Sequence, residues 1–475
     1  MVCLASTRIL IALFCGGCAT SAFALSFTEA LELARKNDPA FLSAQASYQA
    51  AQARSNIAFS ALLPQINASG NTTSNDRKYV TKGNPETTDN EKFNSNTAQI
   101  NLTQALWRHA EYIASTQADL ASQQSERQAA AAEHDLFVRF LQAWFDVMLA
   151  RDNLYFSNKQ SVAARKLRDQ TARAAELGIA SEPEVEDALA RHEKALAEQA
   201  AAEAEEEAKF ASLEQIVGPV QKFTPPSLPE NQRSNSVAGK PLSHWLDLAE
   251  NSNPSIVAAT YAVRAASEEI RKQRAGHEPT LDITGSYGRS AQGSGTTPSQ
   301  RGYTNTQGTI GLQLNIPIFS GGGQSAKVRE AIALRDKTAQ DLESARRGVR
   351  SACKQAWFGI QAGIARQNAA TQAVKSATAT LRVATLGKEL ELKTDLDVLQ
   401  ATQQLYGALR DLQNARYGIL LNEIKLKAAA GQLAVEDVVA LNAAFVRSGG
   451  NADPATDRLP APRQNSPAAF NRPHD

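Results

Sequence analysis

The tetrapeptide Gln-Ala-Trp-Phe occurs twice in this chain of 475 residues, at positions 142–145 and at positions 355–358. The two copies lie 213 residues apart (355 minus 142), and the chain contains only four tryptophans. A rare residue repeated within the same four letters indicates an internal duplication. Two copies of so large a unit predict one pseudo-symmetric architecture rather than a solenoid of many short units.

The duplication extends far beyond the tetrapeptide. The same offset of 213 places Gly218 on Gly431, and no insertion is needed between residues 104 and 218. Further upstream an offset of 215 (254 minus 39) places Pro39 on Pro254. We therefore predict two repeats, at residues 25–218 and 241–433, joined by an inter-repeat linker at residues 219–240.

Each repeat opens with a short helix and a longer one. The sequence Asn-Asp-Pro at 37–39 ends the first short helix, and Asn-Pro at 253–254 ends its counterpart. Proline cannot continue a helix and pushes the preceding residue out of the α region. The predicted helices span residues 27–36 and 40–62 in the first repeat, and 242–251 and 255–274 in the second.

The hydrophobic period then changes from 3.6 to 2. Within residues 309–316, the apolar side chains Ile310, Leu312 and Leu314 alternate with Gly311 and Gln313. Strict alternation predicts a strand with one apolar and one polar face. Similar patterns occur at 98–103, at 281–287 and, more weakly, from residue 66. We predict two hairpins, whose strands are joined by long polar loops at residues 72–93 and 290–302.

A very long helix follows each hairpin. No proline or glycine occurs between Trp107 and Leu177, a stretch of about 105 Å if it is helical. The second repeat has its counterpart at about 324–386. A turn and a returning helix follow in each repeat, ending near residues 217 and 430. The repeated tetrapeptide lies midway along each long helix, so we expect it to be a packing position that is used twice.

The first 24 residues have a basic start, an apolar stretch and an Ala-Phe-Ala end, which is typical of a secretory signal peptide cleaved after Ala24. A lipoprotein signal at Cys18 is the alternative. No later run approaches the ~20 apolar residues of a membrane helix. The final segment, residues 434–475, is expected to be a largely disordered tail.

Composition argues against several function classes. The 50 Lys and Arg residues nearly balance the 49 Asp and Glu residues, so the charge gives no indication of nucleic-acid binding. The six histidines do not have metal-ligand spacing, and no pairing of a nucleophile with a base stands out. We predict that the protein is not an enzyme and uses no cofactor or metal.

An exported chain with four half-apolar strands points to a membrane β-barrel, with lipid outside and water inside. An open sheet edge in lipid would leave backbone groups unpaired. Four strands cannot close, because the smallest barrels need about eight, so the chain must oligomerise as a dimer, trimer or tetramer. The alternatives are a small sandwich packed on the helices and a periplasmic coiled-coil scaffold without a pore.

This order of elements resembles the TolC-type outer-membrane channel family. Residues 315–322 (Asn-Ile-Pro-Ile-Phe-Ser-Gly-Gly) are similar to its strand-to-helix junction, residues 394–401 to the start of its last inner helix, and residues 31–39 to its opening helix. The resemblance covers about residues 25–433. It implies an α+β membrane protein in which a homotrimer completes a 12-stranded transmembrane β-barrel and a long α-helical barrel, located in the Gram-negative outer membrane and extending into the periplasm.

The resemblance also implies partners and a role. The channel would be the exit duct of a tripartite export system, docking to a periplasmic adaptor (membrane fusion) protein and to an inner-membrane ABC or proton-driven transporter, and passing an exported substrate. The altered turn near Glu391 and the weak case for lipidation favour type I secretion of a protein or toxin. A multidrug or metal efflux channel is the alternative.

The family gate lies at the periplasmic tip, where a ring of acidic residues narrows the opening. The matching positions are Asp397 and Gln400. Three like carboxylates brought close together would raise one another's pKa. The candidates for a lock between neighbouring tip helices are Glu184, Lys388 and Lys393, and we expect a Glu184–Lys388 ion pair to be an ionic version of such a lock.

Two further sets of positions follow from the same resemblance. Glu391 occupies the usual glycine position of the second tip turn. The residues expected to dock the adaptor are Gly178, Ile179, Ala180, Glu391 and Leu392. The residues expected at the strand–helix junctions are Pro64, Pro279, Pro317 and Gly321.

Overall fold

The computed structural model describes residues 26–220, 240–294 and 301–439. The predicted signal peptide, most of the predicted linker and the tail beyond residue 439 lie outside the described residues. The elements are α1 (Phe27–Asn37), α2 (Pro39–Ser60), β1 (Gln65–Thr81), β2 (Thr87–Trp107), α3 (His109–Glu176), α4 (Glu182–Val217), α5 (Leu242–Ser252), α6 (Pro254–Ala275), β3 (Thr280–Gln292), β4 (Tyr303–Asn315), α7 (Gly323–Glu389) and α8 (Asp395–Ala429).

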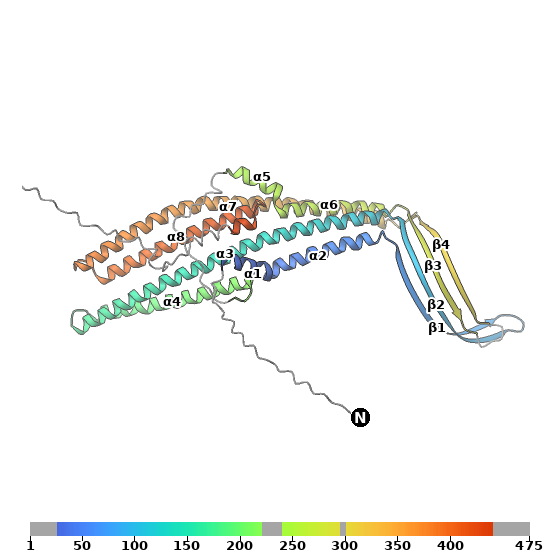
Figure 1. Ribbon diagram of the computed structural model, residues 1–475, viewed down its shortest axis with the longest axis horizontal. Coiled ribbons are helices and arrows are strands. Elements are labelled where there is room, and N and C mark those ends of the chain that lie inside the picture. The colour runs from blue at the N-terminus through green and yellow to red at the C-terminus, as the bar shows by residue number, and fades with distance from the viewer. Residues whose placement is uncertain (1–25, 221–239, 295–300, 440–475) are drawn as a thin grey trace, which may run out of the picture.

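The two repeats have the same order of elements and lie side by side. The helices form a long bundle, the four strands extend from one end of it, and the tips of the α3–α4 and α7–α8 hairpins lie at the opposite end (Figure 1). Helix α3 has 68 residues and is about 100 Å long. Among the described helices, none is both long enough and apolar enough to cross a membrane.

The helix boundaries follow from local capping. Asp38 accepts a hydrogen bond from the N–H of Phe41 at 2.7 Å and caps α2, which begins with Pro39. Asn253 caps α6 in the same way by accepting from the N–H of Ser255 at 2.9 Å. A side-chain oxygen at the cap satisfies an N–H that the helix leaves free, and proline fits the first helical position. The short helices therefore end where the two Asn/Asp-Pro sequences predict.

The sheet has the order β1-β2-β3-β4, and all three pairings are antiparallel. The register places Ile66 beside Leu102, Leu102 beside Gly285, and Gly285 beside Ile310. The alternating aliphatic residues thus share one face across all four strands. Ile310 is 83% exposed, so this apolar face is uncovered within one chain. The strands do not fold back onto the helices, which argues against the sandwich alternative (Figure 1).

The prediction of a long polar loop at residues 72–93 is wrong. Strand β1 continues to Thr81 and β2 begins at Thr87, so most of this segment is a two-stranded ribbon. Because β2 pairs with β3 only from Ser95 onward, the ribbon projects beyond the four-stranded sheet. Backbone pairing needs no apolar face, and charged pairs across the ribbon support it. Examples are Lys92–Asp76 at 3.0 Å and the Arg77 Nε–Glu91 bond at 3.1 Å.

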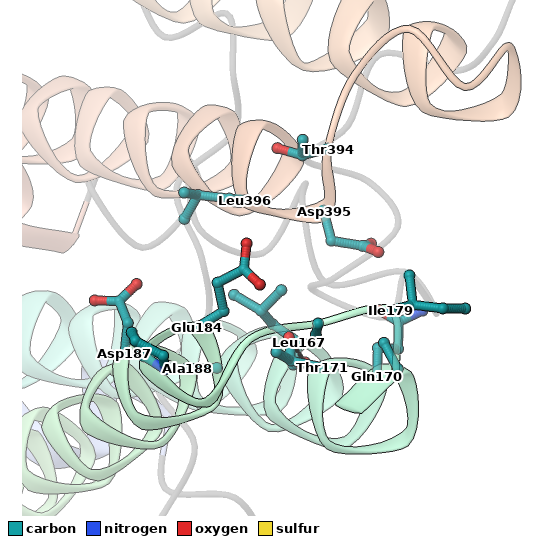
Figure 2. Close-up of a pocket in the computed structure, with 13 residues that line it drawn as sticks. Leu167, Gln170, Thr171, Ile179, Glu184, Asp187, Ala188, Thr394, Asp395 and Leu396 are labelled. Atoms are coloured by element: carbon teal, nitrogen blue, oxygen red, sulfur yellow. Dashed lines mark hydrogen bonds between the residues drawn. The ribbon is translucent and has the colours of Figure 1, made fainter. Parts of the chain in front are cut away.

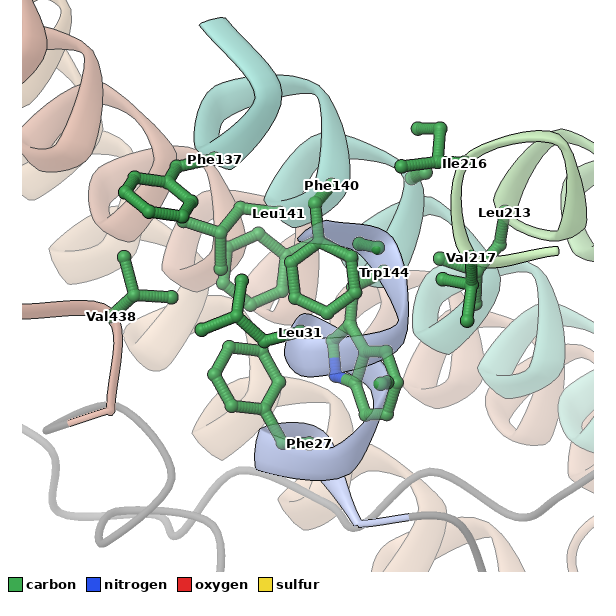
Figure 3. Close-up of a cluster of buried hydrophobic side chains, with 14 of the residues drawn as sticks. Phe27, Leu31, Phe137, Phe140, Leu141, Trp144, Leu213, Ile216, Val217 and Val438 are labelled. Carbon is green, nitrogen blue, oxygen red and sulfur yellow. The ribbon is translucent and has the colours of Figure 1, made fainter. Parts of the chain in front are cut away.

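The main core is built mostly from the first repeat, and α8 of the second repeat contributes Tyr417, Leu420 and Ile424 to it (Figure 3). Trp144 of α3 is fully buried, and its ring meets that of Phe27 of α1 edge-on at 5.2 Å. Leu213 and Val217 of α4 pack into the same cluster. Burying large aromatic side chains contributes strongly to stability, so this cluster fixes how α1, α3 and α4 sit together.

The repeated tetrapeptide is a packing position in both repeats, but not in the same way. Trp357 is half-buried beside a smaller cluster around Trp245 of α5. Phe145 is 3% exposed and stacks on Tyr417 of α8 with ring centroids 5.4 Å apart. Its counterpart Phe358 is 56% exposed. The tryptophans therefore fulfil the expectation of a packing position, whereas the second phenylalanine does not.

The expected disordered tail is packed at its start. Residues 435–439 form a short helical turn after α8, and Val438 is fully buried in the core of the first repeat. In Figure 3 the Val438 side chain points toward Phe137 and Leu141 of α3. The end of the second repeat therefore closes the core of the first.

Candidate functional site: the paired hairpin tips

The first hairpin tip is a tight turn built on a left-handed glycine. Gly178 has φ +72°, and its N–H donates to the carbonyl of Ala175 at 2.9 Å. The N–H of Ile179 reaches back to the carbonyl of Ala174 at 2.8 Å. This pattern satisfies the last free carbonyls of α3 and reverses the chain into α4.

The second tip has the same turn, but a glutamate occupies the left-handed position that glycine adopts at lower cost. Glu391 stands where the offset of 213 places Gly178, and it has φ +58°. Its N–H donates to the carbonyl of Lys388 at 3.0 Å, and the N–H of Leu392 donates to that of Gly387 at 2.7 Å. A left-handed conformation costs a residue with a side chain about 1–2 kcal/mol. The turn has therefore changed its sequence while keeping its geometry.

Gly387 has a role that the sequence did not reveal. A Cβ atom at this position would lie 2.6 Å from Cγ of Lys393, so only glycine allows the Lys393 side chain to cross the last turn of α7. Lys393 then extends toward Asp397, with Nζ 3.5 Å from its carboxylate. The early glycine thus positions a cation next to the predicted gate residue.

Asp397 is held at the start of α8 by a capping box. Its carboxylate accepts from the N–H of Thr394 at 2.8 Å and from the Thr394 hydroxyl at 2.9 Å, while the N–H of Asp397 donates back to that hydroxyl. These bonds, together with Lys393, hold the pKa of Asp397 below its usual value. Within one chain the carboxylate is therefore ionised, which is the state that a cation-attracting ring requires.

Glu184 holds the equivalent place in the first repeat. It accepts from the N–H of Ser181 at 2.7 Å and from the Ser181 hydroxyl at 2.9 Å, and these bonds lower its pKa. Asp187 is the counterpart of Gln400, and it pairs with Arg191 at 2.7 Å. The exposed side chain of Gln400 carries no charge. Each repeat thus has one capping carboxylate at its tip, and only the first repeat adds a second acid one turn later.

The expected Glu184–Lys388 pair is not among the contacts of the described residues. Lys388 instead forms an ion pair with Asp395, within its own hairpin. Asp395 also accepts from the amide of Gln170 of α3 at 3.2 Å, with the amide nitrogen turned toward it. Asp395 therefore ties the two hairpins together. The sequence did not predict this contact because Gln170 lies far from Asp395 in the chain. The expected pair with Lys388 does not form among the described residues, where Glu184 caps α4 instead.

A cavity of about 510 Å³ separates the two tips just beside this contact. Leu167, Thr171 and Ile179 line it from the first hairpin, and Thr394 and Leu396 line it from the second (Figure 2). Three carboxylates from both hairpins also border it, namely Glu184, Asp187 and Asp395. The tips therefore contact each other through the polar Asp395–Gln170 pair and leave open space next to it, and the aromatic packing of Phe156 on Tyr406 between the hairpins lies further from the tips.

Both turns present aliphatic side chains to solvent at the extreme end of the bundle. Leu177 and Ile179 are exposed at the first tip, and Leu390 and Leu392 at the second. Ala180 lies in the same first turn and is half-buried. Paired exposed aliphatic residues on a rigid turn can be covered by the helices of another protein. The predicted docking residues are therefore on the surface, at the same height in both repeats.

The predicted junction residues lie between the helices and the sheet. Pro64 separates α2 from β1, and Pro279 separates α6 from β3. Pro317 and Gly321 lie in the connector between β4 and α7, residues 316–322, where Gly321 has φ +61°. The first repeat has only Arg108 at this place. Its guanidinium binds Asp282 of β3 through two hydrogen bonds of 2.7 and 2.9 Å.

Comparison with known proteins gives a consistent result over both repeats. Residues 30–219 and 245–432 each match the family described as outer membrane efflux protein. The chain is 30% identical over 448 residues to the outer membrane protein TolC of Escherichia coli (strain K12), covering 92% of this chain and 88% of that protein. It is 27% identical over 448 residues to the alkaline protease secretion protein AprF of Pseudomonas aeruginosa, covering 93% and 92%.

The fold has solved counterparts as well. The crystal structure of the Campylobacter jejuni CmeC outer membrane channel superposes with a TM-score of 0.71 and covers 88% of this chain and 89% of that one. The two sequences are 17% identical, so this likeness concerns the fold alone. The overall arrangement of helices and strands is therefore one that a solved outer membrane channel also has.

Proposed function

The chain belongs to the outer membrane efflux protein family, and on this premise we propose that it is the homotrimeric exit duct of a type I protein secretion system. The resemblance to TolC-type channels is confirmed by the family match over both repeats, and with it the location in the outer membrane. Members of this family are channels and not enzymes. The trimer, the cargo and the partners are the proposed part.

The sheet is the observation that carries this proposal. Strands β1 and β4 are its two edges, and their aliphatic residues on one face, Ile66 and Ile310 among them, are exposed, while those of β3 are half-buried. In a bilayer each edge needs a partner strand, because no water is present to satisfy its backbone groups. Three copies joined β4 to β1 give twelve strands, enough to close a barrel with lipid outside and water inside.

The tips support a gate at the other end of the duct. The ionised carboxylate of Asp397 lies in the first turn of α8, and three copies would form a ring of three such groups. Gln400 adds no charge to this ring. We expect Asp397 to attract cations into a narrow opening, and the Lys388–Asp395–Gln170 contact to help hold that opening closed.

Type I secretion is supported by the similarity to AprF, a protease secretion protein, which extends over nearly the whole length of both chains. In such a system the exposed turns would dock a periplasmic adaptor that couples the duct to an inner-membrane ABC transporter. Efflux is the second candidate because the family description itself names it; a proton-driven transporter would then be the partner.

Conductance of the purified protein in a planar bilayer tests the duct. We expect small cation-selective channels from the wild type, and a larger or less selective conductance from Asp397→Ala. Absence of channels from folded, inserted protein would return the pore-free scaffold to first place. To separate the two cargoes, the gene would be deleted from its host. Loss of a secreted protein with unchanged drug and metal tolerance supports secretion, and the reverse pattern supports efflux.

A further inference from the structure

The two long helices have different surroundings within one chain. Helix α3 packs against α2 and α4 of its own repeat and also against α6 and α8 of the other repeat. Helix α7 packs against α6 and α8 of its own repeat and against α5, and these are its main contacts among the described residues. By the repeat relation, the counterparts of α6 and α8 that would complete the surroundings of α7 are α2 and α4 of another copy of the chain.

A contact between α3 and α6 within the chain indicates which residues would meet between α7 and α2 of another copy. Between α3 and α6, the Gln117 amide donates to Glu269 at 2.8 Å. The offset of 213 takes Gln117 of α3 to Glu330 of α7, and the offset of 215 takes Glu269 of α6 back to Arg54 of α2. If α7 and α2 of two copies pack as α3 and α6 do within one chain, the carboxylate of Glu330 lies next to the guanidinium of Arg54.

Both residues suit this assignment. Arg54 and Glu330 are exposed, and neither has an ion-pair or hydrogen-bond partner among the described residues. Most of the acidic residues near Glu330 on α7 do have partners, such as Asp341 with Lys337 and Glu343 with Arg347. Arg54 and Glu330 occupy mutually related positions and are complementary in charge.

A second position supports the same arrangement. Phe145 of α3 is covered by Tyr417 of α8, and its counterpart Phe358 of α7 is exposed. The offset takes Tyr417 to Ala204 of α4, a small residue on an exposed helix face. An exposed phenylalanine opposite an alanine fits a contact that forms only when another copy is present.

We propose that Arg54 and Glu330 form an ion pair between α2 of one protomer and α7 of the next. This inference rests on the homotrimer proposed above and names the residues that join its subunits. The pair lies about two turns below the sheet, where the strands of neighbouring copies must meet in register. It therefore helps to align the β4–β1 closure of the barrel.

Cross-linking tests the proximity directly. In a Cys353→Ala background, Arg54→Cys and Glu330→Cys are combined in the full-length protein, inserted in its membrane and treated with a short bismaleimide. We expect covalent dimers and trimers on a denaturing gel. The matched control combines Arg54→Cys with Glu343→Cys, because residue 343 lies 13 positions further along α7, about 20 Å away along the same helix. The control pair should stay monomeric.

Charge reversal tests the ion pair. Arg54→Glu alone and Glu330→Arg alone should lower the temperature at which the trimer dissociates in detergent, and the double reversal should recover most of that loss. Trimers that neither cross-link through residues 54 and 330 nor respond to either reversal would overturn this inference and leave the duct in place. A wild-type protein that remains monomeric in the membrane would instead overturn the proposed trimer itself.

Discussion

Helices α3 and α7 are equivalent elements of the two repeats, yet they differ in how many helices cover them. Helix α3 is packed against helices of both repeats, whereas α7 is packed mainly against helices of its own repeat. In α3 the tetrapeptide at 142–145 buries both its tryptophan and its phenylalanine. In α7 the same letters leave Phe358 largely exposed and Trp357 only half-buried. The sequence of a packing position does not determine its burial, because burial depends on which neighbour the topology supplies.

The residues that cap α2 and α6 also differ between the two repeats, one being charged and the other neutral. Asp38 caps α2, and its buried carboxylate receives two hydrogen bonds from Arg139 of α3 at 2.9 and 3.1 Å. Asn253 caps α6 with a neutral amide, which also donates to the carbonyl of Ala429 at 2.9 Å. Burial alone would raise the pKa of Asp38, but the guanidinium of Arg139 and the Phe41 N–H outweigh it and lower the pKa. The first repeat is thus held by a charged pair where the second uses an amide.

The largest expected effect on stability comes from a substitution in the core around α3. Trp144→Ala should lower the free energy of unfolding by about 4 kcal/mol, because it leaves a cavity in a filled core. Trp357→Ala should cost about half as much, since Trp357 is only half-buried. The midpoint of denaturant unfolding, measured for both variants under identical conditions, checks the ratio. Equal losses from the two substitutions would contradict the difference between the cores.

A second test concerns a pair of buried positions that the repeats fill differently. Glu423 of α8 is the counterpart of Phe210 of α4, and both are buried. One carboxylate oxygen of Glu423 has no hydrogen-bond partner among the described residues, and burial raises its pKa from 4.5 to about 7, while Lys427 opposes the rise. A raised carboxyl pKa means that the folded state holds the proton more tightly. Its stabilising effect is therefore complete below pH 4.5 and disappears as the pH rises through 7.

We expect Glu423→Gln to flatten this pH dependence by about 2 kcal/mol between pH 5 and pH 8. The glutamine stays neutral, so the variant should be more stable than the wild type at pH 8 and similar to it at pH 5. Thermal unfolding at both pH values provides the measurement. The matched control is Glu205→Gln, an exposed acid on α4 whose loss should leave the pH profile unchanged. An unchanged profile for Glu423→Gln would mean that the carboxyl titrates normally.

The smallest expected effect sharpens the comparison of the tips. Glu391→Gly should stabilise the second turn by about 1 kcal/mol, because it relieves the left-handed glutamate. Gly178→Ala should destabilise the first turn by a similar amount, for the same reason in reverse. Hydrogen exchange of the Leu392 and Ile179 amides reports each turn separately. Faster exchange at Leu392 in Glu391→Gly would show that the glutamate side chain stabilises the turn.

Much of the fold was predictable because it depends on local chemistry. Proline at positions 39 and 254 fixes where the short helices end, and the alternation around Ile310 identifies a strand. The long helices followed from the absence of proline and glycine. The polar ribbon at 72–93 was missed because ladder hydrogen bonds and charged cross-strand pairs leave no hydrophobic period in the sequence.

The tip site was only partly predictable. Glu391 could be recognised as a residue in a glycine position, and the capping box of Asp397 lies where the sequence places it, while its role as a gate residue stays a prediction. The contact of Asp395 with Lys388 and Gln170 could not be found, since it depends on how two hairpins far apart in the chain lie against each other. The burial of Val438 was missed for the same reason, because the five-residue helical turn at 435–439 has no pattern that indicates its distant partners.

The two strand–helix connections have a mechanical consequence. Helix α3 joins the sheet through a single residue, Arg108, which is bonded to Asp282. Helix α7 joins it through seven residues with two left-handed glycines, Gly321 and Gly322. We therefore expect a torque applied at the hairpin tips to be transmitted to the sheet mainly through the short connection of α3, because the longer connection of α7 can change its backbone conformation instead.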